Sequence, residues 1–309
     1  MCDVPALRFP EFTGEWKFVH LKDVAEFQKK RISSDLLNNN NYISTENILQ
    51  NFEGIQYSSS IPTNTNVIEY QKGDILLSNI RPYLKKVWFS DRKGGCSADV
   101  FVLRGDKCDQ HFLYYVIASD RFINYVMSGV KGVKMPRGDK SQMEKYAFSI
   151  PTNTEQRKIA KFLSMLDERI KLQNKIIEKL ETLIKGIRHN IFKQLRKDVG
   201  FNATIGNILS FEQPQRYIVS SAEYSSDCTF TPVLTANKAF ILGYTTETDG
   251  IYSKGDCIII DDFTLDCKYV SFPFKVKSSA IKILTAKNKY ILRYTYEYLK
   301  SLELSTEEH

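Results

Sequence analysis

One stretch constrains this chain more than any other. From about residue 152, apolar side chains recur at alternating steps of three and four for more than 30 residues. A period of 3.5 residues held over more than four heptads is typical of a coiled-coil seam. The sequence therefore predicts one helix roughly 60 Å long. Its predicted seam consists of Ile159, Leu163, Leu166, Ile170, Gln173, Ile177, Leu180, Ile184, Ile187 and Ile191.

The start of this helix carries a capping signal. Thr152 and Glu155 have the capping-box spacing, which predicts that the helix begins near Asn153. A single domain is only some 30 to 40 Å across, so the length favours a partner helix over packing on the flanking domains alone. Gln173 would fix the register with that partner, and self-association through the seam is one way to supply it.

The chain is long enough for two domains. With 309 residues, we expect a first domain at 1–151, the helix at 152–197 and a second domain at 198–309. Residues 155–197 hold 12 Lys and Arg against 5 Asp and Glu, a surplus as large as the whole chain's net charge of +7. Such a helix can follow nucleic acid phosphates, although a charged helix face is often simply solvated.

Other features narrow the class of protein. No apolar run approaches the roughly 20 residues that span a bilayer, and the N-terminus does not resemble a signal peptide, so we expect a cytoplasmic protein with no membrane partner. The six cysteines form no C-x-x-C pair and the four histidines are scattered. These patterns predict reduced thiols and no metal site.

The flanks of the helix resemble each other. Residues 21–24 correspond to 205–208, the Lys-Gly-Asp turn and strand start at 72–75 correspond to 254–257, and Phe112-Leu113 correspond to Tyr290-Ile291. These offsets lie between about 178 and 184 residues, which predicts two copies of one module. In each copy the Gly-Asp pair would turn the chain just before an apolar strand.

Catalytic motifs are missing. The sequence contains no G-x-x-x-x-G-K-[ST] loop, no G-x-G-x-x-G fingerprint, no G-x-S-x-G motif and no Asp/Asn-Pro-Pro-aromatic segment. Asp261 and Asp262 are adjacent on a predicted strand, so their carboxylates would point to opposite faces. The sequence therefore shows no recognisable catalytic site.

Two loops combine polar, aromatic and basic residues suited to DNA. The first offers base-edge readers, an aromatic ring and cations, and the second is basic and punctuated by glycine. Either loop is equally compatible with a solvated surface. The predicted DNA-binding residues are Ser78, Asn79, Arg81, Tyr83, Lys85 and Lys86 in the first loop, and Lys131, Lys134, Arg137 and Lys140 in and just after the second.

Several of these segments together resemble the specificity subunits of type I restriction-modification systems. The resemblance rests on VPALRFPEF at residues 4–12, GEW at 14–16, KGDIL at 72–76, and the helix start with Ile150-Pro151, Glu155-Gln156, Ile159 and Leu166-Asp167. It extends over essentially the whole chain.

The resemblance implies an α+β fold in which two repeated α/β target recognition domains are joined by a long coiled-coil helix. Each domain would read one half of a split site in double-stranded DNA. The helix would set the spacer and dock modification (methyltransferase) subunits, and a restriction subunit would complete the complex. The chain itself would carry no cofactor, because S-adenosylmethionine would bind the modification subunits, and ATP and Mg²⁺ the restriction subunit.

The chain departs from the family pattern after the second module, where no second long helix follows. We therefore expect an incomplete second domain and a seam without its usual intrachain partner. Two other functions stay open at this point: a free-standing DNA-binding regulator that dimerises through the helix, and a coiled-coil scaffold with no role on nucleic acid.

Overall fold

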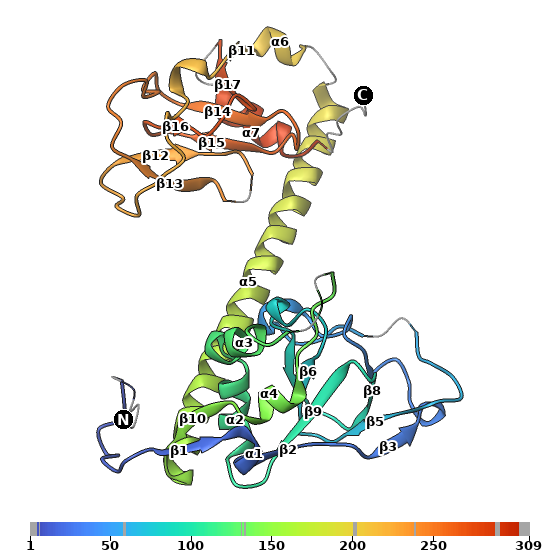
Figure 1. Ribbon diagram of the computed structural model, residues 1–309. Coiled ribbons are helices and arrows are strands. Elements are labelled where there is room, and N and C mark those ends of the chain that lie inside the picture. Colours follow the sequence, from blue (N-terminus) through green and yellow to red (C-terminus); the bar gives the residue numbers. More distant parts are fainter. Residues whose placement is uncertain are drawn as a thin grey trace. The chain divides into compact units, whose positions relative to one another are not determined.

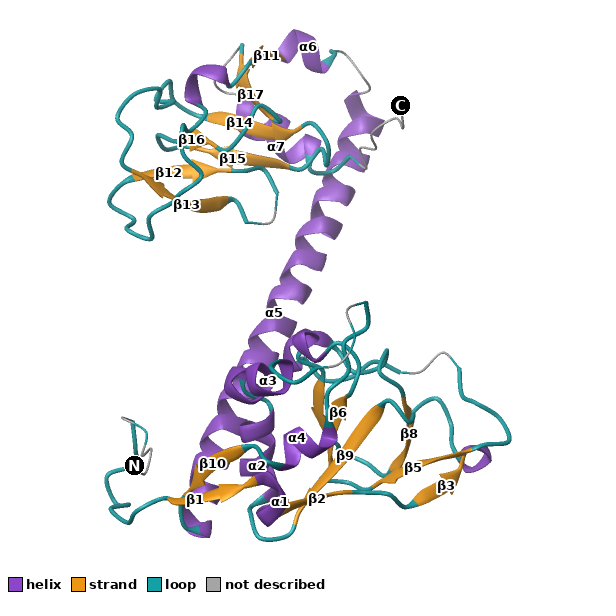
Figure 2. Cartoon of the chain, in the orientation of Figure 1, coloured by secondary structure: helices purple, strands orange, loops and turns teal. Residues whose placement is uncertain are grey.

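The computed structural model of the chain is shown in Figures 1 and 2. It describes residues 5, 7–57, 60–130, 132, 134–199, 203–237, 239–287 and 291–302. The chain divides into two compact units, Met1–Leu172 and Gln173–His309. The division falls inside the long helix, so the first part of that helix belongs to the first unit and the rest to the second.

The long helix is confirmed as α5 (Asn153–Val199), which has 47 residues. The carbonyl oxygen of Thr152 accepts a hydrogen bond from the amide of Gln156 (2.9 Å), which places Thr152 at the cap. The carboxylate of Glu155 accepts from Arg8 at 2.6 and 2.7 Å and from Trp16 at 3.3 Å. This tertiary contact ties the N-terminal segment to α5, and the capping-box pattern did not predict it.

The described residues of the first unit form three sheets. One is antiparallel with the order β2 (Ala25–Phe27), β9 (Val100–Gly105), β6 (Ile75–Ser78) and β7 (Val87–Phe89). Another has the order β3 (Arg31–Ser33), β5 (Asn66–Tyr70), β8 (Gly94–Cys96) and β4 (Tyr42–Ile43). The third pairs β1 (Lys17–His20) with β10 (Ala147–Ile150).

Helices cover one face of the β6 sheet. They are α1 (Leu21–Val24), α2 (Gln110–Ile117), α3 (Asp120–Met127) and α4 (Lys140–Glu144). Three short 3₁₀ turns lie in the connections of the unit: η1 (Ser34–Leu36), η2 (Gln50–Phe52) and η3 (Pro82–Leu84). Successive strand residues point to opposite faces. Ile75 and Leu77 therefore pack in the helix-side core, whereas Leu76 packs in the core beside the other sheet. Both faces of β6 are covered, which explains its unbroken apolar sequence.

The second unit repeats this plan. Its main sheet has the order β11 (Leu209–Glu212), β17 (Ile281–Ala286), β14 (Cys257–Asp261) and β15 (Cys267–Val270). A smaller sheet has β13 (Ile241–Thr245), β12 (Thr231–Leu234) and β16 (Lys275–Val276). The remaining elements are α6 (Ile205–Ile208), η4 (Gln215–Tyr217) and α7 (Leu292–Leu299).

Helix α7 packs against the last part of α5. Arg188 donates to the Glu297 carboxylate at 2.8 and 3.0 Å. The Phe192 ring lies 5.5 and 5.2 Å from the rings of Tyr294 and Tyr298. In the first unit, α2 contacts the first part of α5 in the same manner, through a 2.8 Å hydrogen bond from Tyr115 to Asp167. Each copy of this helix thus anchors its own unit to α5.

The predicted repeat is confirmed by the strand orders. The segment α1–β2 corresponds to α6–β11, and β9, β6 and β7 correspond to β17, β14 and β15. An equivalent backbone hydrogen bond closes each sheet, from Asn79 to the carbonyl of Asp99 (2.8 Å) and from Asp262 to that of Ala280 (3.0 Å). Among the described residues, the second unit has no counterpart of α3, α4 or β10.

Two predicted correspondences are wrong in register. Ile75 pairs with Leu103, and the equivalent partner of Leu284 is Ile258, so Ile75 corresponds to Ile258 and not to Cys257. A one-residue slip in a strand reverses every side chain, so only this register keeps the faces consistent. Tyr290 lies outside the described residues, and the bounds of α2 and α7 align Gln110 with Leu292. The predicted helix match is therefore displaced by about four residues.

Candidate nucleic-acid interface

The two loops with predicted DNA-binding residues meet in the first unit. Arg81 donates its amide proton to the carbonyl of Pro136 (2.8 Å), and Gly138 donates to the carbonyl of Asn79 (3.1 Å). Ile80 and Arg137 form an antiparallel bridge between these bonds. The connection 79–86 after β6 and the segment 134–138 before α4 therefore make one surface at the end of β6 (Figure 1).

A third segment, which the sequence did not single out, joins this surface. The amide of Phe52 donates to the carbonyl of Lys85 (3.0 Å), and the Lys86 ammonium donates to the carbonyl of Thr45 (2.7 Å). This segment, 44–56, also presents exposed Asn51. Asn and Gln are readers of adenine edges, and the polar run TENILQN at residues 45–51 is the signal that could have identified it.

The side chains on the outside of this surface suit DNA contact. Arg81, Lys134 and Arg137 are exposed, and Tyr83 is 48% exposed. Arg137 lies 3.3 Å from the Asp99 carboxylate. These residues offer bidentate donors for guanine and phosphate and an aromatic ring for apolar contact. This group, Arg81, Tyr83, Lys134 and Arg137, is called the reading surface below.

The backbone of the first loop is strained. Arg81 and Lys85 both have left-handed conformations, with φ of 51° and 54°, on either side of the η3 turn. Residues other than glycine seldom adopt this region, and the surrounding structure must hold them there. The hydrogen bonds to Pro136 and Phe52 supply that support. These hydrogen bonds connect both ends of the η3 turn to neighbouring segments and stabilise this loop conformation.

Two predicted residues support the loop from inside. Ser78 is 1% exposed, and its hydroxyl donates to the carbonyl of Ile80 (3.0 Å). The Asn79 Oδ1 atom is buried. A Cβ atom at Gly138 would lie 2.4 Å from Met143 Cε, the end of a flexible side chain, so a larger residue at this position would have to displace the Met143 side chain. The structure thus places Ser78 and Asn79 beneath the reading surface.

Three of the predicted DNA-binding lysines are not counted in the reading surface. Lys85 pairs with the Asp120 carboxylate at 2.7 Å. Burial lowers the pKa of the Lys86 ammonium. Lys131 lies outside the described residues. These lysines are thus not part of the described reading surface.

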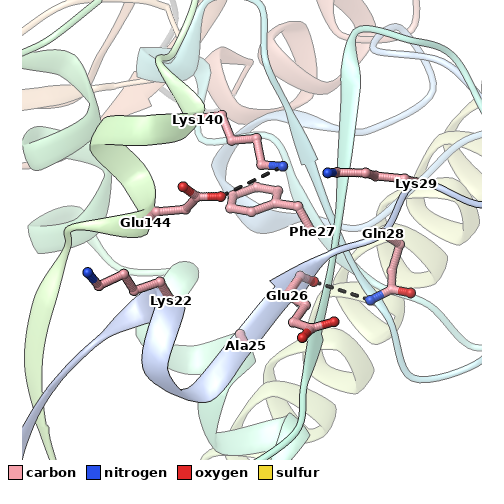
Figure 3. A pocket seen from close by; sticks show the side chains of 8 residues that line it. All are labelled: Lys22, Ala25, Glu26, Phe27, Gln28, Lys29, Lys140 and Glu144. Atoms are coloured by element: carbon pink, nitrogen blue, oxygen red, sulfur yellow. Dashed lines mark hydrogen bonds and ion pairs between the residues drawn. The ribbon is translucent and has the colours of Figure 1, made fainter.

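Lys140 lies away from the reading surface, in an open pocket of about 460 Å³. Figure 3 shows its side chain lying over the Phe27 ring and directed toward Glu144. Its ammonium is 4.9 Å from the ring centroid and 3.7 Å from the Glu144 carboxylate. The pocket is lined by Lys22, Ala25, Glu26, Phe27, Gln28, Lys29, Lys140 and Glu144. The lining has three lysines against two glutamates, and Lys140 lies beside Glu144, so the positive surplus of the pocket is small.

The predicted seam is largely open to solvent. Ile159 is partly buried against the core of the first unit, and Leu163 is half-buried. The later apolar seam residues are between 42% and 56% exposed, and Gln173 is exposed among them. Further exposed apolar side chains lie along the same part of α5: Phe162, Met165, Leu172, Ile176 and Leu183. Such a contiguous apolar strip is typical of a protein interaction site.

The described ranges offer neither a cluster of metal ligands nor a membrane-spanning helix. No group of three or more His, Cys, Asp or Glu side chains there is placed to hold a metal ion. Within the same ranges, none of the helices combines the length and the apolar character needed to cross a membrane.

Comparison with known proteins identifies the family. The profile described as "Type I restriction modification DNA specificity domain" matches residues 13–182. This match covers more than half of the chain, so the protein belongs to that family. Membership of this family does not favour the hypothesis that the protein is a free-standing DNA-binding regulator.

Individual relatives agree. The chain is 51% identical over 102 residues to the type I restriction enzyme EcoR124I/EcoR124II specificity subunit of Escherichia coli, covering 32% of this chain and 25% of that protein. It is 23% identical over 192 residues to the EcoDI specificity subunit of the same organism, covering 60% and 43%. The chain thus spans less than half of the length of these curated relatives.

A solved structure shares the fold. The type I restriction-modification S subunit from M. genitalium matches with a TM-score of 0.64 and 19% identity, over 96% of this chain and 79% of that one. This likeness confirms the α+β fold, with a long helix between sheet-rich parts.

Proposed function

We propose that this protein is the DNA sequence-recognition subunit of a type I restriction-modification complex, and that each of its two units reads one half of a bipartite site in double-stranded DNA. The reading surface carries this proposal. Three cationic side chains and a tyrosine stand exposed on loops that hydrogen bonds hold in one conformation. Preorganised donors of this kind give direct base readout, and their charges add phosphate affinity.

The long helix would serve as spacer and docking site. The 47 residues of α5 extend roughly 70 Å, about two turns of B-DNA. Its exposed seam would receive helices of the modification subunits, and a restriction subunit would join that complex in the cytoplasm. The chain would contribute recognition and no catalysis, so S-adenosylmethionine, ATP and Mg²⁺ would bind to the partner subunits.

Methylation mapping tests the whole proposal. DNA from cells that carry this chain with its modification subunit should be methylated at a split sequence with a fixed spacer. DNA from cells lacking either component should not. Methylation at an unsplit site, or in the absence of this chain, would contradict the proposal.

The reading surface has its own test. We expect Arg81→Ala and Arg137→Ala each to weaken binding of the mapped site and to reduce the slope of log K against log salt by about 0.9 where a phosphate contact is lost. Lys93→Ala removes an exposed cation at the β7–β8 turn, at the other end of β7, and serves as the matched control. Equal effects of all three variants would show that only general charge matters.

We also propose that the chain self-associates through α5 when no partner covers the seam. Aspartate at Ile170, Ile177 and Ile184 places charge in the centre of the strip and should make the chain monomeric. Lys175 is exposed on the other side of the helix, so Lys175→Asp is a control for added negative charge. Sedimentation velocity measures the outcome, and a strictly monomeric wild type would refute self-association.

A further inference from the structure

The connection between β14 and β15 in the second unit occupies the place of the first reading loop. Asp262 and Asn79 each donate the equivalent sheet-closing hydrogen bond, to Ala280 and Asp99. A second equivalent pair lies beside it, because Ser97 donates to the carbonyl of Ile43 (2.9 Å) and Lys277 donates to that of Leu234 (3.1 Å). Residues 262–266 are thus the structural counterpart of 79–86.

The two connections carry opposite charges. The first contains Arg81, Lys85 and Lys86 and no acidic residue, whereas the second contains Asp262 and Asp266 and no basic residue. Lys282 neutralises Asp262 at 2.7 Å. A turn rich in carboxylates is repelled by phosphates and by the negative potential of the minor groove. The second unit therefore needs a different way to contact DNA at this position.

The turn presents an aromatic ring to solvent. Phe263 is 77% exposed, the largest exposure of any aromatic ring among the described residues. Its counterpart in the first unit, Ile80, is bridged to Arg137. Burying the apolar surface of this exposed ring against a binding partner would be favourable.

The Phe263 ring projects from a turn that hydrogen bonds to Asp261 stabilise. The buried Asp261 carboxylate accepts hydrogen bonds from the amides of Phe263 (2.9 Å) and Thr264 (3.0 Å) and from the Thr264 hydroxyl (3.3 Å). Leu265 completes the turn with φ of 56°. A turn fixed in this way loses little conformational entropy when its tip meets a ligand.

We propose that Phe263 is a specificity-determining residue of the second unit, and that its ring packs on the C5 methyl group of a thymine in the major groove of the second half-site. The thymine methyl is the apolar group that bases display in that groove, and phenylalanine is one of the side chains that contact it. Flanking carboxylates are tolerated there, since cytosine and adenine amino groups donate to acceptors. This inference rests on the proposed DNA-reading function.

The test uses the full chain in complex with its modification subunits and duplexes that carry the mapped site. Each thymine of the second half-site is replaced in turn by uracil, which lacks only the methyl group. Wild-type affinity should fall about fourfold at one position, the value of one buried methyl. Phe263→Ala should weaken binding of the normal site about tenfold and should no longer distinguish uracil from thymine at that position.

Two controls isolate the contact. Phe211→Ala removes another exposed ring, 56% exposed on the edge strand β11, and should keep the response to uracil. Arg81→Ala should keep it too, while lowering the salt slope that Phe263→Ala leaves unchanged. These paired readouts separate an apolar base contact from general weakening.

Several results would overturn the inference. The absence of any uracil-sensitive position, or a Phe263→Ala variant that still responds to uracil, contradicts the methyl contact. A variant that loses modification subunits without changing base preference would make Phe263 a protein contact. Wild-type complexes that recognise no split site would instead contradict the proposed function itself.

Discussion

The same Gly-Asp turn precedes the central strand of both units but reaches different surroundings. In the first unit, Asp74 is 1% exposed and accepts two 2.7 Å hydrogen bonds from Arg104 and one from the amide of Gln71. In the second unit, Asp256 is exposed and accepts from the Tyr269 hydroxyl at 2.5 Å. Strand β14 has one additional residue at its start, Cys257, and this residue changes where the carboxylate of the turn lies relative to the sheet.

The comparison shows that a repeated motif can keep its backbone role while its side chain changes role. Both glycines of the turn have positive φ, 89° at Gly73 and 100° at Gly255. The turn is therefore the conserved element of the repeat, and the ion pair is particular to the first copy.

Replacing the aspartate of each turn should give the largest difference in stability between the two units. Asp74→Ala removes the hydrogen bonds from Arg104 and Gln71 but leaves Arg104, whose side chain is 37% exposed, open to water. It should destabilise the first unit by about 1.5 to 3 kcal/mol, whereas Asp256→Ala should change the second by less than about 1 kcal/mol. Hydrogen exchange with mass spectrometry reports the opening free energy of each unit in the intact chain. Equal losses would break the comparison.

The glycines should behave alike. Alanine at Gly73 or Gly255 meets no close neighbour but must adopt a disfavoured positive φ. Each substitution should therefore destabilise its own unit by about 1 to 2 kcal/mol in the same exchange measurement. A difference of more than about 1 kcal/mol between them would show that the turns are not equivalent.

Two buried tyrosines sharpen the contrast at a smaller scale. Tyr70 and Tyr252 are both fully buried. The Tyr70 hydroxyl donates to the carbonyl of Asn41 (2.9 Å), whereas the buried Tyr252 hydroxyl has no hydrogen-bond partner among the described residues. Tyr70→Phe should therefore cost about 1 kcal/mol and Tyr252→Phe close to nothing. Chemical denaturation of the two variants checks this order.

The smallest expected effect is a pH dependence confined to the second unit. A hydrogen bond from Lys254 lowers the pKa of the Glu212 carboxyl. A depressed carboxyl pKa adds stability above the ordinary glutamate pKa, and that stability is lost as pH falls through the lowered value. Lys254→Met should flatten the acid limb of the second unit's exchange profile and leave the first unit's profile unchanged. An unchanged limb would contradict a stabilising role for this pair.

Features with local causes were predictable from the sequence. The heptad period predicted the long helix, and the capping spacing predicted its start at Asn153, because both patterns depend only on neighbours along the chain. The repeat followed from similar segments in similar order. The sequence did not reveal that Ile75 corresponds to Ile258. The additional residue at the start of β14 can be recognised only from the pairing of that strand with β17.

The candidate nucleic-acid interface was harder to predict from the sequence, because long-range contacts bring its segments together. Ser78 and Lys140 have types that suit DNA, but burial in β6 and packing on Phe27 place them elsewhere. That the loops at Arg81 and Arg137 meet depends on how α3 and α4 fold back, which no short pattern encodes. The segment around Thr45 joins them for the same reason.

The open seam on α5 also has a consequence for the supply of this protein in a cell. A chain that exposes Leu166, Ile170, Ile177 and their neighbours is prone to aggregation and to removal by proteases until something covers them. If the seam is the proposed docking site, the amount of soluble protein should follow the amount of the partner that covers it. Synthesis of the two in matched quantities would then regulate the complex, and surplus copies would be cleared before they occupied DNA unaccompanied.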